Sequence, residues 1–441
     1  MVKPGEPRWA PRPQGTARWI PQPPYEPRPL VRSILRLVCW PPMFLLGIPL
    51  NLAYNSILYI FKRPTFGYKR FVISGLARYL TGSLGLGAVY APDPDHGKIT
   101  PAMLKLYGDR ANASVKTIPP IADSVPRLPI VQIAGNKVRP EPVTAFMVAP
   151  KTAAGTSPKH IWREAGKDEK IIYYVVGGGY QTGHPLQWSL AWDWCNESKL
   201  RVFAPNYRKC LDNASAFPGP LYDFLAGWQF LVEDLGFEPR NIVLNGNSAG
   251  AHAIIQLTGY LDELMETGWT NWGLPAGVFA CSPWADVTAS FPSVSTNWTN
   301  DWLQSTTPVI APSYARHYSS YLNSPYISPA LITPPHATFS RLAKAGVKFY
   351  INVGSDEQLR DENIALTDAM TASGLDPHFL LIEGGSHCEF VFEGLPVTPW
   401  PGAGFSWPLV NGQWKTLLKE IGFDGGFDKA EVAEVVTGEK E

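Results

Sequence analysis

A glycine-flanked serine near the middle of the chain constrains the fold most strongly. Residues 241–250 read Asn-Ile-Val-Leu-Asn-Gly-Asn-Ser-Ala-Gly, so an apolar run typical of a strand leads directly into Gly246-x-Ser248-x-Gly250. A helix-forming segment follows at once. This order predicts a sharp strand-to-helix turn that exposes the Ser248 hydroxyl. Such a turn requires glycine at positions 246 and 250, because a Cβ at either one would clash with the neighbouring strand or helix. The alternative interpretation is an ordinary glycine-serine turn in an α/β protein.

The composition is that of a globular protein without a highly charged partner. Of the 441 residues, 45% are hydrophobic, which is enough for a sizeable core. Basic and acidic side chains balance at 38 each, so the chain lacks the excess positive charge that nucleic-acid binding uses. We therefore expect one large catalytic domain with an appendage, and no nucleic-acid partner.

The cysteines define neither a metal site nor a disulfide framework. The five of them are Cys39, Cys195, Cys210, Cys281 and Cys388. None has the spacing of metal ligands. A bridge between Cys195 and Cys210 is open to the chain in an oxidising compartment, but we expect two buried thiols. No metal or organic cofactor is suggested by the sequence.

The N-terminal part of the chain differs in character from the rest. Residues 1–30 contain nine prolines and no apolar periodicity, which predicts a Pro-rich extended tail. Residues 37–61 carry no charge and are long enough to cross a bilayer, although prolines and asparagines within them would kink and weaken a spanning helix. The cations that flank this run are Arg32, Arg36, Lys62 and Arg63. We expect a membrane anchor or monotopic hairpin at residues 31–65, and the alternative is a soluble apolar lid or core segment.

The remainder of the chain indicates an α/β fold. Residues 66–135 show no clear series of strands, and we expect a connecting and capping region there. From residue 136 to about 430, runs of strand length alternate with helical patterns such as 221–235 and 249–265. The expected strands lie at 143–149, 171–176, 200–204, 242–244, 278–281, 347–353 and 379–382. This alternation predicts a mostly parallel, doubly wound sheet, and a strand-free insertion at about 287–335 is expected to form a cap over the carboxyl ends of its strands.

A serine nucleophile needs a base that takes its proton and a carboxylate that orients the base. His387 is the preferred base, because it follows the last expected strand and the glycines before it allow a sharp turn. The other histidines beyond Ser248 are expected in the cap or at the start of a strand. They are His317, His336 and His378.

The acid should follow the strand before the last one, because the order Ser, acid, His is that of a doubly wound hydrolase. Asp356 is the carboxylate nearest the end of that strand, and Glu357 follows it directly. Asp361 and Glu362 are interpreted as first-turn helix residues that favour the helix dipole. Asp286 is the competing candidate. The acid would hold the imidazole in the required tautomer and stabilise the imidazolium that forms during attack.

An oxyanion hole needs backbone N–H groups aimed at the developing negative charge. Three glycines follow the buried strand at 171–176, and Gly178 and Gly179 are the expected donors, with the amide of Ala249 as the third. A flexible glycine turn or a phosphate loop is the alternative, but no Lys-Ser/Thr follows to make a nucleotide site.

Together these residues resemble the hormone-sensitive-lipase-like family of α/β-hydrolases, and within it the fungal steryl acetyl hydrolase-like and arylacetamide deacetylase-like esterases. The resemblance covers about residues 140–420. Further segments with close counterparts in the family are Asn206-Tyr207-Arg208, Ser282-Pro-Trp-Ala-Asp286, Tyr326-Ile-Ser-Pro329 and Asp356-x-x-x-Arg360-Asp361-Glu362. The resemblance implies the α/β-hydrolase fold with a helical cap, and it implies Ser248, Asp356 and His387 as the triad. An N-terminal apolar segment is also typical of membrane-bound members.

The chain departs from the family pattern at several positions. Val176 stands where the family has a histidine that supports the oxyanion loop, so we expect a working but altered hole. Asn247 stands where aspartate is common, and Ala251-His252 replaces a second glycine. His252 lies one helical turn from Ser248 and is expected to be a packed helix residue rather than a second base.

The sequence thus predicts a membrane-associated serine esterase or deacetylase, expected in the endoplasmic reticulum, that acts on a small hydrophobic ester such as an acetylated lipid or a terpenoid from secondary metabolism. Six aromatic residues of the cap would line its pocket or form core under a long loop. They are Phe291, Trp298, Trp302, Tyr314, Tyr318 and Tyr321. An amidase, lactonase or acyltransferase would use the same triad. A membrane-tethered binding protein with a retired hydrolase fold is the alternative outside enzymes.

Overall fold

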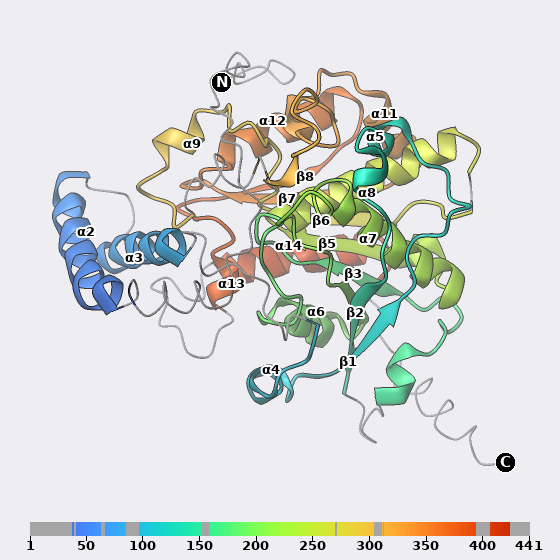
Figure 1. Cartoon of the computed structure of the whole chain (residues 1–441), viewed down its shortest axis with the longest axis horizontal. Coiled ribbons are helices and arrows are strands. Elements are labelled where there is room, and N and C mark those ends of the chain that lie inside the picture. The colour runs from blue at the N-terminus through green and yellow to red at the C-terminus, as the bar shows by residue number, and fades with distance from the viewer. Residues whose placement is uncertain are drawn as a thin grey trace.

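The computed structural model describes residues 38, 41–62, 67–84, 97–151, 158–269, 271–303, 311, 313–393 and 406–423. Within this part of the chain, eight strands form one central sheet with helices on both faces (Figure 1). The tail expected at residues 1–30 lies outside the described residues.

The sheet has the order β1-β2-β4-β3-β5-β6-β7-β8. Its strands are Ala111–Ile118 (β1), Val143–Pro150 (β2), Ile171–Val175 (β3), Arg201–Pro205 (β4), Ile242–Asn247 (β5), Gly277–Cys281 (β6), Lys348–Gly354 (β7) and His378–Ile382 (β8). β1 pairs with β2 and β2 pairs with β4 in antiparallel register, and every other pairing is parallel. The strands from β3 to β6 are buried throughout, as expected for a parallel sheet that is covered on both faces.

All seven strands expected from the sequence are present, with ends displaced by at most three residues. The region 66–135, for which no series of strands was expected, contributes one strand, because β1 lies there and forms the edge of the sheet. Most of β1 is partly or fully exposed, and its polar residues give it no clean alternation. The β1 segment is held as a strand by its pairing along the whole length of β2, and its own sequence does not predict that conformation.

The two faces of the sheet are covered by different helices. The helices of the catalytic domain are α4 (Pro101–Tyr107), α5 (Pro129–Gln132), α6 (Leu190–Ser198), α7 (Gly219–Gln229), α8 (Ala249–Glu266), α9 (Ser293–Thr296), α11 (Ala337–Lys344), α12 (Arg360–Ala372), α13 (Phe390–Glu393) and α14 (Ser406–Glu420). α7, α8 and α11 pack in sequence against one another. α6 and α14 lie together, since the rings of Trp194 and Trp414 are 5.2 Å apart and both contact Phe279 of β6.

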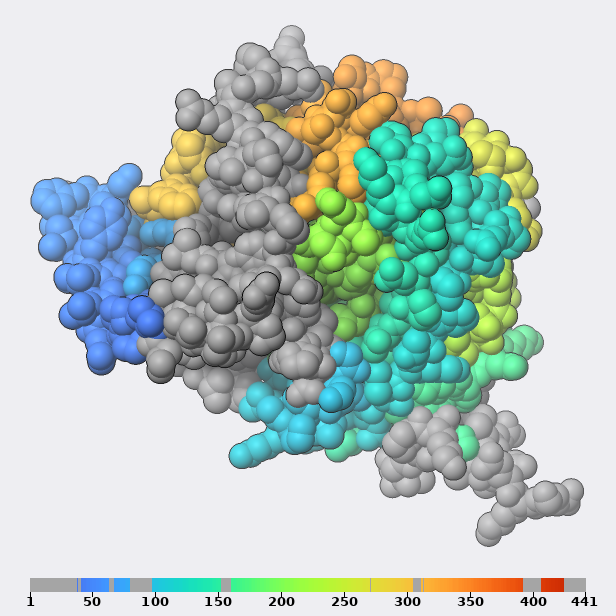
Figure 2. Space-filling view, viewed as in Figure 1, coloured from blue at the N-terminus to red at the C-terminus, as the bar shows by residue number. Residues whose placement is uncertain are grey.

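The apolar N-terminal segment forms a helix that stands out from the catalytic domain. A π-helical turn, Met43–Gly47 (η1), leads into α2 (Ile48–Lys62), and together they form the one described helix that is long and apolar enough to cross a membrane, with a mean hydropathy of 1.5. Only 6% of this stretch is buried. α3 (Tyr68–Leu84) packs between α2 and the rest of the molecule (Figure 1). The N-terminal helices, in blue, project from one side of the molecular surface (Figure 2).

Candidate active site

Ser248 lies at the junction of β5 and α8, in the geometry that the sequence predicts. Its backbone has a φ of 57° and a ψ of −125°, which non-glycine residues rarely adopt, and α8 begins at the next residue. The Ser248 N–H donates to the Cys281 carbonyl at 2.8 Å, and the Ser248 carbonyl accepts the N–H of His252 at 3.1 Å. These bonds tie the turn to β6 and to the first turn of α8, so the strained residue is held in place.

The two flanking glycines are required by close backbone approach. A Cβ at Gly246 would lie 2.5 Å from the Gly250 carbonyl oxygen, and a Cβ at Gly250 would lie 2.0 Å from the Val175 carbonyl oxygen. Both distances are far inside van der Waals contact. The prediction that side chains at these positions would clash with the neighbouring strand and helix is confirmed.

His387 follows β8 on a short loop and reaches the serine. Its Nε2 atom is 2.9 Å from Ser248 Oγ. The backbone of His387 is fixed on both sides, because its N–H donates to Asp301 Oδ1 at 3.0 Å and its carbonyl accepts the Trp302 indole N–H at 2.5 Å. The side chain is almost fully buried, so the base is held in one orientation in a dry environment.

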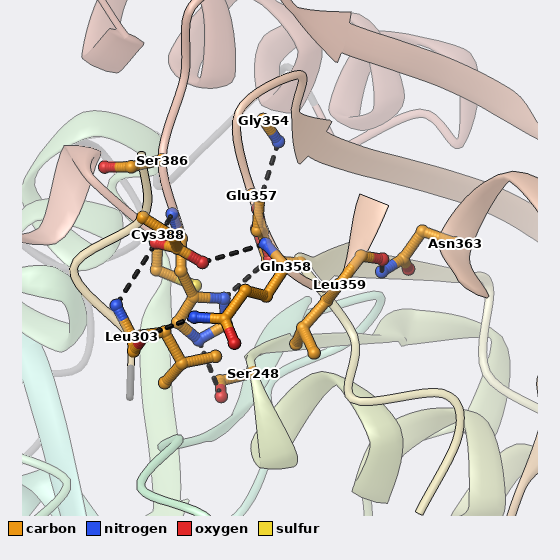
Figure 3. Close-up of polar contacts among 12 residues, drawn as sticks. Ser248, Leu303, Gly354, Glu357, Gln358, Leu359, Asn363, Ser386 and Cys388 are labelled. Carbon is orange, nitrogen blue, oxygen red and sulfur yellow. Dashed lines mark hydrogen bonds and ion pairs between the residues drawn. The ribbon is translucent and has the colours of Figure 1, made fainter. Parts of the chain in front are cut away.

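Glu357, not Asp356, is the carboxylate that binds the histidine, which corrects the expectation from the sequence (Figure 3). Its Oε1 atom is 2.6 Å from His387 Nδ1. The other oxygen, Oε2, accepts hydrogen bonds from the Ser282 hydroxyl at 2.8 Å and the Gly354 N–H at 3.0 Å. The carboxylate is fully buried, and its oxygens are bonded in an arrangement that fixes its plane.

Asp356 takes a different direction from the same turn. Its N–H donates to the Gly385 carbonyl at 3.0 Å, and its side chain is only partly buried. Burial raises the pKa of the Asp356 carboxyl, while the guanidinium groups of Arg70 and Arg360 oppose that shift. Asp286, the competing candidate, is bonded within its own turn to Thr288 and Ser290 instead.

The electrostatics of the site favour a charged histidine during reaction. Burial alone would lower the pKa of His387, but Cys388 and the Glu357 carboxylate outweigh it and raise that pKa well above its ordinary value. Asp301 is a second buried carboxylate beside the histidine, and no motif in the sequence indicated it. Burial raises the pKa of Asp301 to about 6, although His387 opposes the shift.

The glycine loop after β3 lies beside the serine. A Cβ at Gly177 would be 2.9 Å from Ser248 Cβ, so this loop approaches the nucleophile closely. Gly178 and Gly179 have φ values of 120° and 60°. Within the described part of the chain, the amides of these two glycines and of Ala249 donate no hydrogen bond to the protein. Their role as oxyanion donors stays a prediction.

Other residues hold this loop in place of the histidine that is absent at position 176. The Tyr207 hydroxyl donates to the Val176 carbonyl at 3.0 Å. Asn247 Oδ1 accepts hydrogen bonds from the Gly177 N–H at 3.2 Å and the Tyr174 hydroxyl at 3.0 Å. The asparagine that departs from the family pattern thus links the strand before the nucleophile to the glycine loop.

His252 and Tyr180 make a further link between the loop and α8. The Tyr180 hydroxyl is 2.6 Å from His252 Nδ1, and both side chains are fully buried. Burial lowers the pKa of His252 to about 4, against the opposite effect of the Tyr326 and Ile327 backbone. His252 is therefore a neutral, packed helix residue, as expected. The Tyr180 ring also stacks on Tyr314 of the cap, at 4.2 Å between ring centres.

The six cap aromatics have several roles. Phe291, Tyr314 and Tyr318 are buried core residues, while Trp298 and Tyr321 are partly exposed. Trp302 is different, because its ring lies 5.8 Å from the ring of His387. Of the six, the structure thus brings one tryptophan against His387.

The structure places the described cysteine thiols and the side chain types that bind metals relative to one another. Cys195 and Cys210 are both buried and unbridged. Among the residues that the structure describes, no group of three or more His, Cys, Asp or Glu side chains is arranged to hold a metal ion.

Comparison with known proteins identifies the fold. Residues 172–391 match a family model described as the alpha/beta hydrolase fold, and the chain has that fold. No curated protein sequence matches the chain. The finer resemblance to fungal steryl acetyl hydrolase-like proteins stays a prediction.

Three solved structures are similar to the chain, and two of them are described as an esterase/lipase and as an esterase. An esterase/lipase from an uncultured bacterium is 20% identical, with a TM-score of 0.51, over 79% of this chain and 99% of its own. EstE5, soaked with p-nitrophenyl butyrate, is 20% identical, with a TM-score of 0.52, over the same shares of both chains. An esterase from the bacterial hormone-sensitive lipase family is 21% identical, with a TM-score of 0.50, over 84% of this chain and 98% of its own. These identities support a common fold.

Proposed function

We propose that this protein is a serine carboxylic ester hydrolase. The observation that carries the proposal is the continuous hydrogen-bonded series Ser248–His387–Glu357, with distances of 2.9 and 2.6 Å. A nucleophile, a base and an orienting carboxylate in this geometry are what acyl transfer requires. The second oxygen of the Glu357 carboxylate is bound by the Ser282 hydroxyl and the Gly354 N–H, which leaves the first oxygen directed at His387.

In the proposed mechanism, Ser248 Oγ attacks the ester carbonyl carbon while His387 Nε2 takes the hydroxyl proton. The buried Glu357 carboxylate stabilises the imidazolium that forms, and it keeps the remaining N–H on Nδ1. Negative charge then develops on the carbonyl oxygen, where the amides of Gly178, Gly179 and Ala249 would stabilise it. His387 passes its proton to the departing alcohol, and water releases the acyl group by the reverse proton transfers.

The aromatic surroundings of the site support a hydrophobic substrate. The ring of Trp302 lies 5.8 Å from the ring of His387, so an apolar aromatic side chain lies beside the proposed base. We propose an acetyl or short-chain ester of a lipid-like or terpenoid alcohol. Hydrolysis of an amide or lactone, or transfer to an alcohol, would use the same groups. The assay below distinguishes transfer to an alcohol from hydrolysis.

The test is hydrolysis of p-nitrophenyl esters from acetate to palmitate by the full chain, beside the Ser248→Ala variant. Turnover of the short esters that disappears in Ser248→Ala supports the proposal. Lack of turnover of every ester by the folded wild-type protein contradicts it. Transfer to an added alcohol in preference to water would instead identify an acyltransferase.

We also propose that the protein associates with a membrane, such as that of the endoplasmic reticulum, through α2. Five apolar side chains at spacings of four, four, three and four residues form one exposed stripe on the η1–α2 helix. They are Leu46, Leu50, Tyr54, Ile57 and Phe61. Each is more than half exposed, which is costly in water and favourable in a lipid bilayer.

Deleting residues 1–65 should release the protein from the membrane pellet, and the double substitution Leu50→Asp with Ile57→Asp should weaken pelleting. Leu409→Asp is the matched control, because it removes an exposed leucine from α14 at the far end of the chain. Continued pelleting of the deletion variant would contradict the anchor.

A further inference from the structure

The helix that links the apolar segment to the catalytic domain carries two unusually buried arginines. Arg70 and Arg78, on α3, are each only 8% exposed. Arginine is almost never buried to this extent unless its guanidinium is bound by acceptors. Both arginines point toward the part of the molecule that holds His387, and their acceptors lie on the segments around that histidine.

Arg70 binds the loop directly around the histidine. Its guanidinium forms a buried ion pair with Glu389, two residues beyond His387. The same oxygen of Glu389 accepts hydrogen bonds from the backbone N–H and the hydroxyl of Ser386, both at 3.2 Å. Ser386 immediately precedes His387, so Arg70 holds the carboxylate that fixes the backbone just before the histidine.

Arg78 binds the segment that contains the second buried carboxylate. Its guanidinium donates to the backbone carbonyls of Trp298 at 2.7 Å and Asp301 at 2.6 Å. Through its side chain, Asp301 accepts the N–H of His387 at 3.0 Å and the N–H of Gln358 at 2.9 Å. Asp301 therefore joins the histidine loop to the residue that follows Glu357, and Arg78 holds Asp301.

We propose that α3 is a positioning element of the active site, with Arg70 and Arg78 as positioning residues for the loop that carries His387. This inference rests on the proposed esterase function. Catalysis by a hydrogen-bonded triad tolerates displacements of only about 0.5 Å, so residues that fix the backbone on either side of the base affect turnover without touching the substrate.

The contacts between α2 and α3 extend this connection to the apolar helix. A Cβ at Gly75 of α3 would lie 2.2 Å from Asn55 Oδ1 of α2, so the two helices pack at very short distance there. At the other end of the pair, the Tyr79 hydroxyl donates to the Met43 carbonyl at 3.4 Å. The exposed stripe on α2 and the histidine loop thus lie at opposite ends of one continuous set of contacts, with α3 between them.

The experiment compares Arg70→Gln and Arg78→Gln in the full chain with wild type, in detergent and with p-nitrophenyl butyrate. Lys69→Gln is the matched control, because it removes a solvent-exposed cation from the same helix. Active sites are counted by the burst of p-nitrophenol, so that loss of folded protein is separated from slower turnover by each site. Arg78→Lys, which keeps the charge, tests for conservative rescue.

We expect kcat per titrated site to fall by about 10- to 100-fold in both glutamine variants, because a misplaced base slows chemistry more than it weakens binding. KM should stay within about twofold of wild type, since the mutated groups do not touch substrate. Arg78→Lys should recover part of the loss, and Lys69→Gln should behave as wild type.

Wild-type kcat per titrated site in the folded arginine variants would overturn the inference and leave the esterase function standing. Absence of ester turnover by the wild-type protein would overturn both. If Arg70→Gln does not fold, Glu389→Gln takes its place, because it removes the charge that Arg70 binds while keeping an acceptor for Ser386. The same fall in kcat is then expected for Glu389→Gln, and an unchanged kcat would overturn the inference about α3.

Discussion

Replacing Glu357 by glutamine tests the identity of the acid, because an amide can satisfy the hydrogen bonds of this site in only one arrangement. Oε2 of Glu357 accepts the Gly354 N–H, a group that cannot itself accept, so the amide oxygen of Glu357→Gln has to remain there. The amide NH2 then faces His387 Nδ1. That nitrogen must give up its proton, and Nε2 becomes protonated where it faces Ser248.

A histidine in this tautomer cannot take the serine proton. The corresponding carboxylate-to-amide change in a Ser-His-Asp protease lowers kcat by about 10,000-fold, which is about 5.4 kcal/mol of transition-state stabilisation. We expect a loss of that order for Glu357→Gln. Folding should be little affected, because the glutamine is isosteric and keeps the bonds to the Ser282 hydroxyl and the Gly354 amide.

The assay is steady-state hydrolysis of p-nitrophenyl butyrate, with Asp356→Asn as the matched control at the adjacent position. Asp356 does not bind His387, so its amide variant should keep kcat/KM within about threefold of wild type. Thermal unfolding of both variants verifies that each is folded at the assay temperature. A larger loss in Asp356→Asn than in Glu357→Gln would refute the assignment of Glu357.

Three further predictions follow from the geometry. The base works only when neutral, and the pKa of His387 is raised well above 6.5, so kcat/KM should rise with pH through a midpoint above 6.5. A midpoint below 6.5 in the pH–rate profile would contradict this prediction. Gly250→Ala should destabilise the protein by about 3 kcal/mol, because the added Cβ overlaps a strand carbonyl. The control Gly412→Ala, on the open surface of a helix, should stabilise the protein by up to about 1 kcal/mol, and thermal unfolding of both variants measures the two effects. Tyr180→Phe removes the buried hydrogen bond to His252 and should lower kcat by the equivalent of about 1–3 kcal/mol through a loosened glycine loop; an unchanged kcat would show that the bond has no role in turnover.

The parts of the site that the sequence predicted are those set by local chain chemistry. The strand, the strained serine and the two glycines around it form one continuous segment whose spacing already contains the steric requirement. The same holds for His387, which follows a strand and two glycines. Seven of the eight strands were predicted because buried parallel strands are short apolar runs.

The parts that the sequence did not predict depend on direction and on distant partners. Asp356 and Glu357 are adjacent acids after the same strand, and proximity to the strand end favoured the wrong one. The turn sends one side chain toward His387 and the other away from it, and no residue pattern distinguishes the two. Asp301 acts through contacts with segments more than fifty residues away, so its burial beside the histidine has no local signal.

The link between Tyr180 and His252 has an evolutionary consequence. In the family that the chain resembles, a histidine at the position of Val176 supports the glycine loop. In this chain the Tyr180–His252 hydrogen bond ties the loop to α8, in addition to the bonds from Tyr207 and Asn247. We expect a chain that has one of these two arrangements to need the other less. Related chains with valine at position 176 should therefore keep Tyr180 and His252 together, and chains with histidine there should be free to vary both.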